Sequence, residues 1–329
     1  MTHRHHLERA LELAERGRGT THPNPLVGAV LVREGEVVGE GWHERAGEPH
    51  AEVLALEAAG DHARGSTLYV TLEPCAHHGR TGPCADAVVA AGVARVLCAA
   101  GDPDPRTNGK GFARLREAGI AVELATDDLA VRACRQNEAF RTWVAEGRPF
   151  VTYKAAMTLD GRVAASDGES QWISGEASRL RVHQLRARSD AVAVGAGTAR
   201  AENPKLTARD VDAPRQPRRL PFGRGPLPEG SELELLEGPV RAELERLASD
   251  GVQSLLLEGG PTLAGSFLRE GLIDKLVVFV APALLGGDDA PALFSGPGAP
   301  TLKELVPLSG IELDRSGEDI VVTAYVREP

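Results

Sequence analysis

Four residues suited to metal chemistry occur in a fixed order in the first hundred positions of this chain. His50 and Glu52 open a segment whose apolar residues predict a helix. Cys75 follows a proline at the end of a predicted strand, and Cys84 follows a second proline at the start of the next predicted helix. These residues therefore sit on a helix–strand–loop–helix order, which is typical of an α/β domain.

The rest of residues 1–148 continues the same alternation of helices and strands. An N-terminal amphipathic pattern carries Leu7, Leu11 and Ala14 on one helical face. The segment predicts one α/β/α sandwich. The predicted strands are 27–32, 37–41, 67–72, 95–100 and 120–124, and the predicted helices are 50–59, 85–91, 111–118 and a long one that is capped by Asp127 or Asp128 and runs to 146.

A Gly-Arg-Pro break at 147–149 marks the predicted domain boundary, with domains at 1–148 and 149–329. Beyond it the alternation restarts, so the second domain is also predicted to be α/β. Residues 213–238 are rich in Pro, Gly, Arg and Glu and show no clear periodicity. The predicted strands are 150–157, 191–195, 254–257, 276–280 and 320–326, and the predicted helices are 176–187 and 240–250.

One histidine, two cysteines and a nearby glutamate match the signature of zinc-dependent deaminases, in which the glutamate is not a ligand. Three protein ligands, His50, Cys75 and Cys84, leave a fourth position for water. Bound Zn²⁺ lowers the pKa of that water from about 15.7 towards about 7. Glu52 is then placed to accept its proton and to pass it on to the ring nitrogen and the leaving ammonia.

Each of these residues alone has an ordinary structural explanation, such as a helix cap, an exposed carboxylate or a core thiol. A structural zinc site is disfavoured because no fourth Cys or His has suitable spacing; His77 and His78 share the short loop of the cysteines. Cys98 and Cys134 are expected to be packing residues. Four cysteines without an export signal also disfavour a disulfide scaffold.

The charge and hydropathy of the chain limit the classes of partner that we expect for it. The formal net charge is −10 with no long basic stripe, which argues against a nucleic-acid partner. The apolar runs are too short or too interrupted to span a bilayer, and the N-terminus does not resemble a signal peptide. We therefore expect a cytoplasmic protein that acts on a small molecule.

Several longer motifs resemble one enzyme family along nearly the whole chain. In the first half these are THPNPLVGAV at 21–30, GEPHAE at 47–52 and LYVTLEPCAHHGRT at 68–81. In the second half they are RPFV at 148–151, LDGR at 159–162, SQWISG at 170–175, GAGT at 195–198 and EGGPTL at 258–263. They resemble the bifunctional riboflavin-biosynthesis deaminase–reductases, the RibD family, which shares the nine-residue step between the two cysteines.

This resemblance implies a cytidine-deaminase-like N-terminal domain and a dihydrofolate-reductase-like C-terminal domain. The first would deaminate 2,5-diamino-6-ribosylamino-4(3H)-pyrimidinone 5′-phosphate with Zn²⁺. The second would use NADPH to reduce 5-amino-6-(5-phosphoribosylamino)uracil to the ribitylamino product. The resemblance also implies a homodimer or higher homo-oligomer formed through the reductase domain.

The resemblance assigns residues by position. For the deaminase substrate it implies Asn24, His43, His77 and Arg80, with Glu52 catalytic. For the reductase substrate it implies Lys154, Ser170, Arg186, Leu206, Arg209 and Glu258. For the nicotinamide cofactor it implies Ala156, Trp172, Thr198, Glu202, Gly260, Pro261, Thr262, Leu263, Ala264, Gly265 and Ser266.

The chain departs from the family pattern at three places. Glu202 stands where the family has Asp, and Asp104 stands where it has Asn. The segment 211–238 is shorter and less strand-like than expected, and it would lie under the adenosine of the cofactor. This leaves one alternative open, a monofunctional deaminase whose C-terminal domain is degenerate in reduction. A nucleic-acid-editing deaminase and a purely structural zinc module are the other hypotheses.

Overall fold

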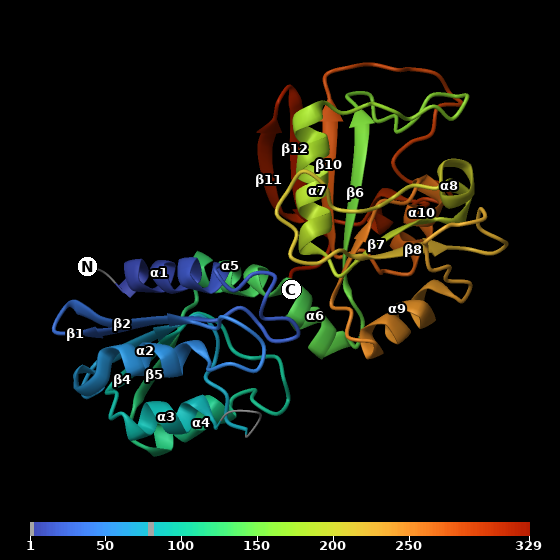
Figure 1. The fold of residues 1–329 in the computed structure, drawn as a ribbon. Coiled ribbons are helices and arrows are strands. Elements are labelled where there is room, and N and C mark those ends of the chain that lie inside the picture. Colours follow the sequence, from blue (N-terminus) through green and yellow to red (C-terminus); the bar gives the residue numbers. More distant parts are fainter. Residues whose placement is uncertain (1–2, 78–81) are drawn as a thin grey trace. The chain divides into compact units, whose positions relative to one another are not determined.

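The computed structural model describes residues 3–77 and 82–329 (Figure 1). The chain forms two compact units, one ending at Glu146 and the other spanning Gly147–Glu328. Each unit is built around one β-sheet, of five strands in the first and seven in the second. In the part of the chain that the structure describes, none of the helices has the length and apolar character needed to cross a membrane.

The N-terminal sheet has the strand order β2-β1-β3-β4-β5. β1 pairs antiparallel with β2 and β3, while β3, β4 and β5 run parallel. The carboxyl ends of the three parallel strands therefore lie at one edge of the sheet, where α/β folds commonly place their ligands. The strands are β1 (Gly28–Arg33), β2 (Glu36–Trp42), β3 (Thr67–Val70), β4 (Arg95–Cys98) and β5 (Ala121–Leu124).

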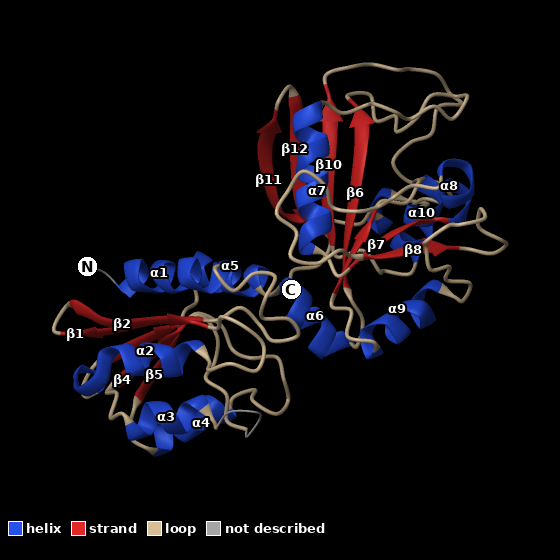
Figure 2. Cartoon of the chain, in the orientation of Figure 1, coloured by secondary structure: helices blue, strands red, loops and turns tan. Residues whose placement is uncertain are grey.

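Helices cover both faces of this sheet (Figure 2). Ala55 of α2, Val88 of α3 and Leu115 of α4 join one core cluster with strand residues. Leu11 of α1 and Leu129 of α5 join another on the opposite face. These two cores confirm the predicted α/β/α sandwich. The helices are α1 (His3–Glu15), α2 (Ala51–Ala59), α3 (Cys84–Ala90), α4 (Lys110–Glu117), α5 (Asp128–Gln136) and α6 (Glu138–Glu146), with a 3₁₀ turn at Gly60–Ala63.

The single long helix predicted to run to residue 146 is wrong, because α5 and α6 are separate helices. Asn137 divides them: its Oδ1 accepts the Leu26 N–H at 2.8 Å and its Nδ2 donates to the Leu26 carbonyl at 2.9 Å. Such side-chain bonds to backbone compete with a continuous helix. The predicted cap is present, since Asp127 Oδ1 accepts the Leu129 N–H at 3.0 Å.

The C-terminal sheet has the order β11-β12-β10-β6-β9-β7-β8. β10, β6, β9, β7 and β8 are parallel, and β12 and β11 extend the sheet antiparallel. Its parallel strands again direct their carboxyl ends to one edge. The strands are β6 (Phe150–Thr158), β7 (Ala191–Gly195), β8 (Arg218–Phe222), β9 (Ser254–Leu257), β10 (Lys275–Ala281), β11 (Ser309–Ser316) and β12 (Asp319–Tyr325).

Helices also cover both faces of the second sheet. Leu244 of α9 and Phe267 of α10 belong to its largest core cluster. Val182 of α7 and Ala199 of α8 pack in smaller clusters with other strand residues. The helices are α7 (Glu176–Arg188), α8 (Ala196–Glu202), α9 (Val240–Ser249) and α10 (Pro261–Arg269), with a 3₁₀ turn at Leu302–Glu304.

Two strands of this sheet were not predicted. β8 lies in the segment 211–238, and Leu236 of the same segment is buried and donates its N–H to the Pro221 carbonyl at 2.8 Å. A proline within β8 weakens its sequence signal, and such a strand is tolerated at the edge of a sheet. β11 is largely exposed, so its sequence lacks a buried face. The segment 211–238 thus supplies an edge strand and part of the core.

Candidate active sites

Three metal-binding side chains meet at one end of the N-terminal sheet. His50 is the N-cap of α2, Cys84 is the first residue of α3, and Cys75 lies in the loop after β3. The His50 Nδ1 atom is 3.2 Å from Cys84 Sγ and 3.7 Å from Cys75 Sγ. Within residues 3–77 and 82–329, this is the group of His, Cys and acidic side chains that is arranged to hold a metal ion.

The geometry of this cluster fits zinc. Usual Zn–N and Zn–S bonds at tetrahedral angles separate the nitrogen and sulfur atoms by about 3.6 Å. The two nitrogen–sulfur distances in the structure, 3.2 and 3.7 Å, bracket that value. Hydrogen bonds from Cys84 and His50 lower the pKa of the Cys75 thiol to about 4 against the effect of burial, and the Cys84 N–H also donates to its sulfur at 3.3 Å. The Cys75 sulfur is therefore suited to be a thiolate ligand. The hydrogen bond with Cys75 and burial raise the pKa of the Cys84 thiol, so Cys84 holds its proton more tightly than Cys75 does.

Glu52 lies in the first turn of α2, beside the three ligands. Its side chain is 3% exposed, and burial raises the pKa of its carboxyl to about 7. A carboxyl group with such a pKa can both accept and release a proton at neutral pH. The cluster and Glu52 open into a cavity of about 360 Å³.

Three of the four predicted deaminase-substrate residues, Asn24, His43 and His77, line this cavity. Arg80, the fourth, lies outside the described residues. The Asn24 Nδ2 atom is 3.0 Å from His43 Nε2, and His43 Nδ1 is 3.1 Å from the Pro49 carbonyl. Burial lowers the pKa of His43. A neutral ring that donates from Nδ1 to Pro49 accepts from Asn24, which leaves the Asn24 carbonyl oxygen for a ligand.

The sequence did not single out Glu73, although it precedes the Pro-Cys motif. Its Oε2 accepts N–H groups of Gly109 at 3.0 Å and Asp102 at 3.4 Å, and its Oε1 accepts that of Phe112 at 3.2 Å. The carboxylate thereby ties the loop 102–109 to the loop that carries Cys75. The sequence also assigned no role to Glu48, Arg106 and Phe140, which line the cavity.

A second group of charged side chains lies where β9 ends, beside the middle of β6. Arg186 of α7 forms a two-point ion pair with Glu258, with Nε–Oε1 at 2.6 Å and Nη2–Oε2 at 2.8 Å. The side chains are 14% and 9% exposed. Burial lowers the pKa of Lys154 on β6, and the charge of Glu258 opposes this effect. The three predicted substrate residues therefore form one charge cluster.

Burial would raise the pKa of Glu258, but the hydrogen bonds from Arg186 and the charge of Lys154 outweigh it and lower that pKa. Glu258 is thus an anion that holds Arg186 in place. Arg209 is different, because its guanidinium is exposed and donates from Nη1 to Thr207 Oγ1 at 3.0 Å. Leu206 is buried with φ +49°, and Ser170 is exposed.

The predicted cofactor residues lie on β6, α8 and the start of α10 and in the loop that carries Trp172. Ala156 lies on β6 and Thr198 on α8, and both are half-buried. Trp172 is 70% exposed, and the Arg179 guanidinium lies 4.9 Å from the centre of its ring. Gln171 Nε2 donates to Glu202 Oε2 at 3.2 Å, so the glutamate at the position of the family's aspartate contacts the loop of Trp172.

The stretch 260–266 forms the start of α10. Gly260 is its N-cap, and Gly260 and Thr262 are exposed, while Pro261, Leu263 and Ser266 are half-buried. Ala264 is buried in the core, and a Cβ atom on Gly265 would lie 2.1 Å from the Ser295 carbonyl oxygen. Ala264 and Gly265 thus pack against other parts of the protein. Contacts of all seven residues with the cofactor therefore stay a prediction.

Both halves of the chain match family models. The RibD C-terminal domain matches residues 149–226 and 232–322, and the zinc-binding region of cytidine and deoxycytidylate deaminases matches residues 1–100. The riboflavin biosynthesis protein RibD of Escherichia coli is 41% identical over 97% of this chain and 98% of its own length. That of Aquifex aeolicus is 40% identical over 97% of both chains. The chain belongs to the RibD family.

Comparison with solved structures leads to the same family. RibD of Acinetobacter baumannii has a TM-score of 0.87 and 38% identity, with 98% of both chains covered. The Thermotoga maritima structure described as a diaminohydroxyphosphoribosylaminopyrimidine deaminase/5-amino-6-(5-phosphoribosylamino)uracil reductase has a TM-score of 0.85 and 33% identity over 98% of both chains. This chain is therefore a bifunctional RibD enzyme of riboflavin biosynthesis, with zinc and NADPH as cofactors. The monofunctional alternative is not favoured.

Proposed function

We propose that the N-terminal site deaminates 2,5-diamino-6-ribosylamino-4(3H)-pyrimidinone 5′-phosphate and that the C-terminal site reduces the resulting phosphoribosylaminouracil to its ribityl form. The observation that carries the first step is the cluster of His50 Nδ1 with two cysteine sulfurs beside buried Glu52. The name of the Thermotoga maritima relative supports both the substrate and the order of the steps.

In the deamination, His50, Cys75 and Cys84 would hold the metal. Zinc, when bound, lowers the pKa of a water molecule and so makes it a nucleophile. Glu52 would carry one proton of that water to the ring nitrogen and then the second proton, from the attached oxygen, to the departing amine. Water and the amino-pyrimidine give a carbonyl and ammonia. Asn24 and His43 would hold the ring through the free Asn24 oxygen described above.

In the reduction, bound NADPH supplies a hydride to the ribose carbon. Lys154, Arg186 and Glu258 would bind the sugar at the carboxyl end of β9, beside the middle of β6. Arg209 is exposed and is therefore better placed than paired Arg186 to bind a phosphate. The exposed N-terminus of α10 at Gly260 would receive the diphosphate of the cofactor, because backbone N–H groups there lack helical partners.

We also propose a homodimer formed through the reductase domain, in the cytoplasm, where a phosphorylated precursor and NADPH are both held. β11 is an edge strand in which Ile311 is 61% and Leu313 71% exposed, and Leu302, in the 3₁₀ turn that precedes β11 in the sequence, is 88% exposed. Apolar side chains on an unpaired edge favour association with another chain. Sedimentation analysis at assay concentrations tests this, and a monomer would contradict it.

Removal of the metal tests whether deamination takes place in the first unit and reduction in the second. Dialysis against a zinc chelator should abolish ammonia release, since His50, Cys75 and Cys84 then hold no ion. NADPH consumption with the deaminated substrate should remain within about two-fold, because those ligands lie only in the first unit. Added zinc should restore deamination. Loss of both activities on chelation, or of neither, would contradict the assignment.

A further inference from the structure

The lining of the deaminase cavity is strongly acidic. Its described residues include one lysine or arginine side chain, that of Arg106. The same lining contains five carboxyl groups, those of Glu48, Glu52, Glu73, Asp102 and Asp104. This acidic lining repels a substrate that carries a phosphate group, so a cation in the lining would favour the binding of such a substrate.

Arg106 is held in place by Asp104. Its Nε is 3.0 Å from both carboxylate oxygens, its Nη2 is 2.5 Å from Oδ2, and its backbone N–H donates to Oδ1 at 2.8 Å. The Asp104 side chain is 10% exposed, whereas that of Arg106 is 70% exposed. The pair therefore anchors a guanidinium in the cavity lining while most of its surface remains open to solvent.

The outer edge of this guanidinium is free to bind an anion. Nη1 has no hydrogen-bond partner among residues 3–77 and 82–329, and Nη2 has a second N–H. A guanidinium that uses one edge for a carboxylate can offer its other N–H groups to phosphate oxygens. The loop is further fixed by Glu73, which binds the Gly109 N–H, and by His77, whose Nδ1 is 3.2 Å from Thr107 Oγ1.

We propose that Arg106 recognises the 5′-phosphate of the deaminase substrate and that Asp104 is the positioning residue that aims it. This inference rests on the proposed function and names the group that sets its preference for a phosphorylated substrate. Asp104 stands where the family has Asn, and its negative charge would repel phosphate if it were not paired. Arg106 both neutralises that charge and supplies the binding cation.

The test compares two substrates, the diaminopyrimidine ribosylamino 5′-phosphate and the same compound without its phosphate. In Arg106→Ala, KM for the phosphorylated substrate should rise about 10- to 100-fold, the usual effect of a lost charge-assisted hydrogen bond. Its kcat should stay within about three-fold, and kcat/KM for the dephosphorylated substrate should not change. Zinc content and NADPH consumption by the same protein show that both units are folded.

Two further variants test the role of Asp104 and provide a control arginine outside the cavity. Asp104→Asn combined with Arg106→Ala should have a lower KM than Arg106→Ala alone, because the unpaired carboxylate that repels phosphate is gone. Arg114→Ala removes a guanidinium paired with Asp86 at 2.7 Å outside the cavity lining, and it should behave as the unmutated enzyme.

An unchanged KM in Arg106→Ala, or an equal rise for both substrates, would overturn this inference while leaving the proposed function intact. Release of no ammonia from either substrate by the unmutated, zinc-loaded enzyme would instead overturn the proposed function, and this inference with it.

Discussion

Glu52→Gln lowers the rate of ammonia release by about 10²- to 10⁴-fold, the usual contribution of a general acid–base. The amide has nearly the shape of the carboxyl group but cannot accept the proton of the attacking water. Glu52 is 3% exposed, and burial raises its pKa to about 7, so the native group is suited to both halves of the proton transfer. The measurement is kcat for ammonia release by zinc-loaded protein.

The same variant shows whether Glu52 takes part in the reaction or in holding the metal. Its zinc content should equal that of the unmutated enzyme, because Glu52 is not among the three ligands. NADPH consumption in the other unit provides the internal control and should be unchanged. A variant that binds zinc normally and still deaminates at the full rate would remove Glu52 from the mechanism and would favour a purely structural metal.

Glu258→Gln should have the largest effect in the reductase unit. The substitution removes the anion that pairs with Arg186 at 2.6 and 2.8 Å and leaves two cations, Arg186 and Lys154, without their counter-charge. Breaking a buried ion pair costs about 3–5 kcal/mol. NADPH consumption should fall by more than about 100-fold. The free energy of unfolding of this unit, measured with denaturant, should fall by the same amount of about 3–5 kcal/mol.

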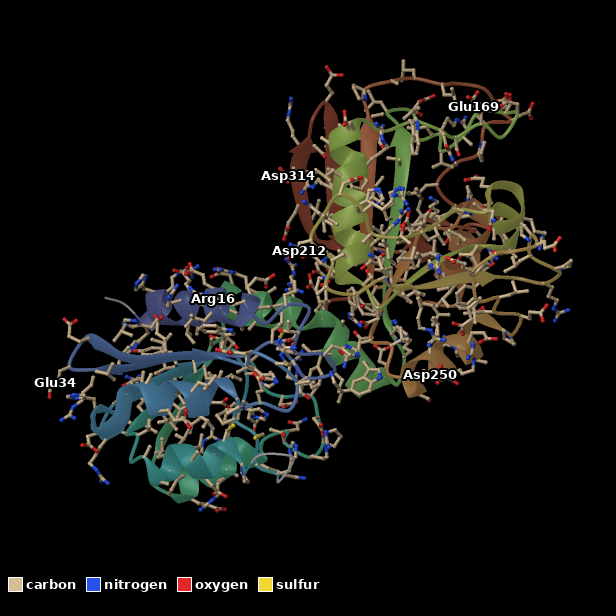
Figure 3. The ribbon with its side chains drawn as sticks, viewed as in Figure 1. Arg16, Glu34, Glu169, Asp212, Asp250 and Asp314 are labelled. Carbon is tan, nitrogen blue, oxygen red and sulfur yellow. The ribbon has the colours of Figure 1, made fainter. Side chains whose placement is uncertain are left out.

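Another arginine of α7 gives the matched control. Arg181 pairs with Asp314 at 2.7 Å, but the side chains are 37% and 65% exposed; Asp314 is labelled in Figure 3. Exposed pairs contribute about 0–1 kcal/mol, so Asp314→Asn should change neither reduction nor unfolding appreciably. If Glu258→Gln matched this control in both measurements, the buried pair would have no part in the site.

The sequence predicted the metal site well because its ligands are of metal-binding residue types and stand next to clearly predicted helices and strands. His50 and Cys84 lie at the starts of helices and Cys75 lies in the loop after β3, and such helix starts and strand ends meet in an α/β fold. Strands with a buried face were also predicted closely, and β7 and β9 have the predicted bounds of 191–195 and 254–257. Periodicity reports burial, so it succeeds where burial is regular.

The remaining features depend on contacts between distant residues. Asn137 ends α5 through Leu26, which is 111 positions away, and no local pattern signals that bond. β8 and β11 are edge strands, whose exposed or proline-containing sequences lack a clear alternation. The pairing of Arg186 with Glu258 joins residues 72 positions apart. The resemblance named both residues but not their contact with each other.

The central claim is that one chain performs both steps in order, and a two-stage assay tests it most directly. Zinc-loaded protein is given the diaminopyrimidine ribosylamino phosphate, ammonia is measured, and NADPH is then added while its absorbance is followed. We predict one ammonia per substrate and then one NADPH consumed per ammonia released. Ammonia without NADPH consumption would contradict the reductase half, and the absence of ammonia would contradict the whole account.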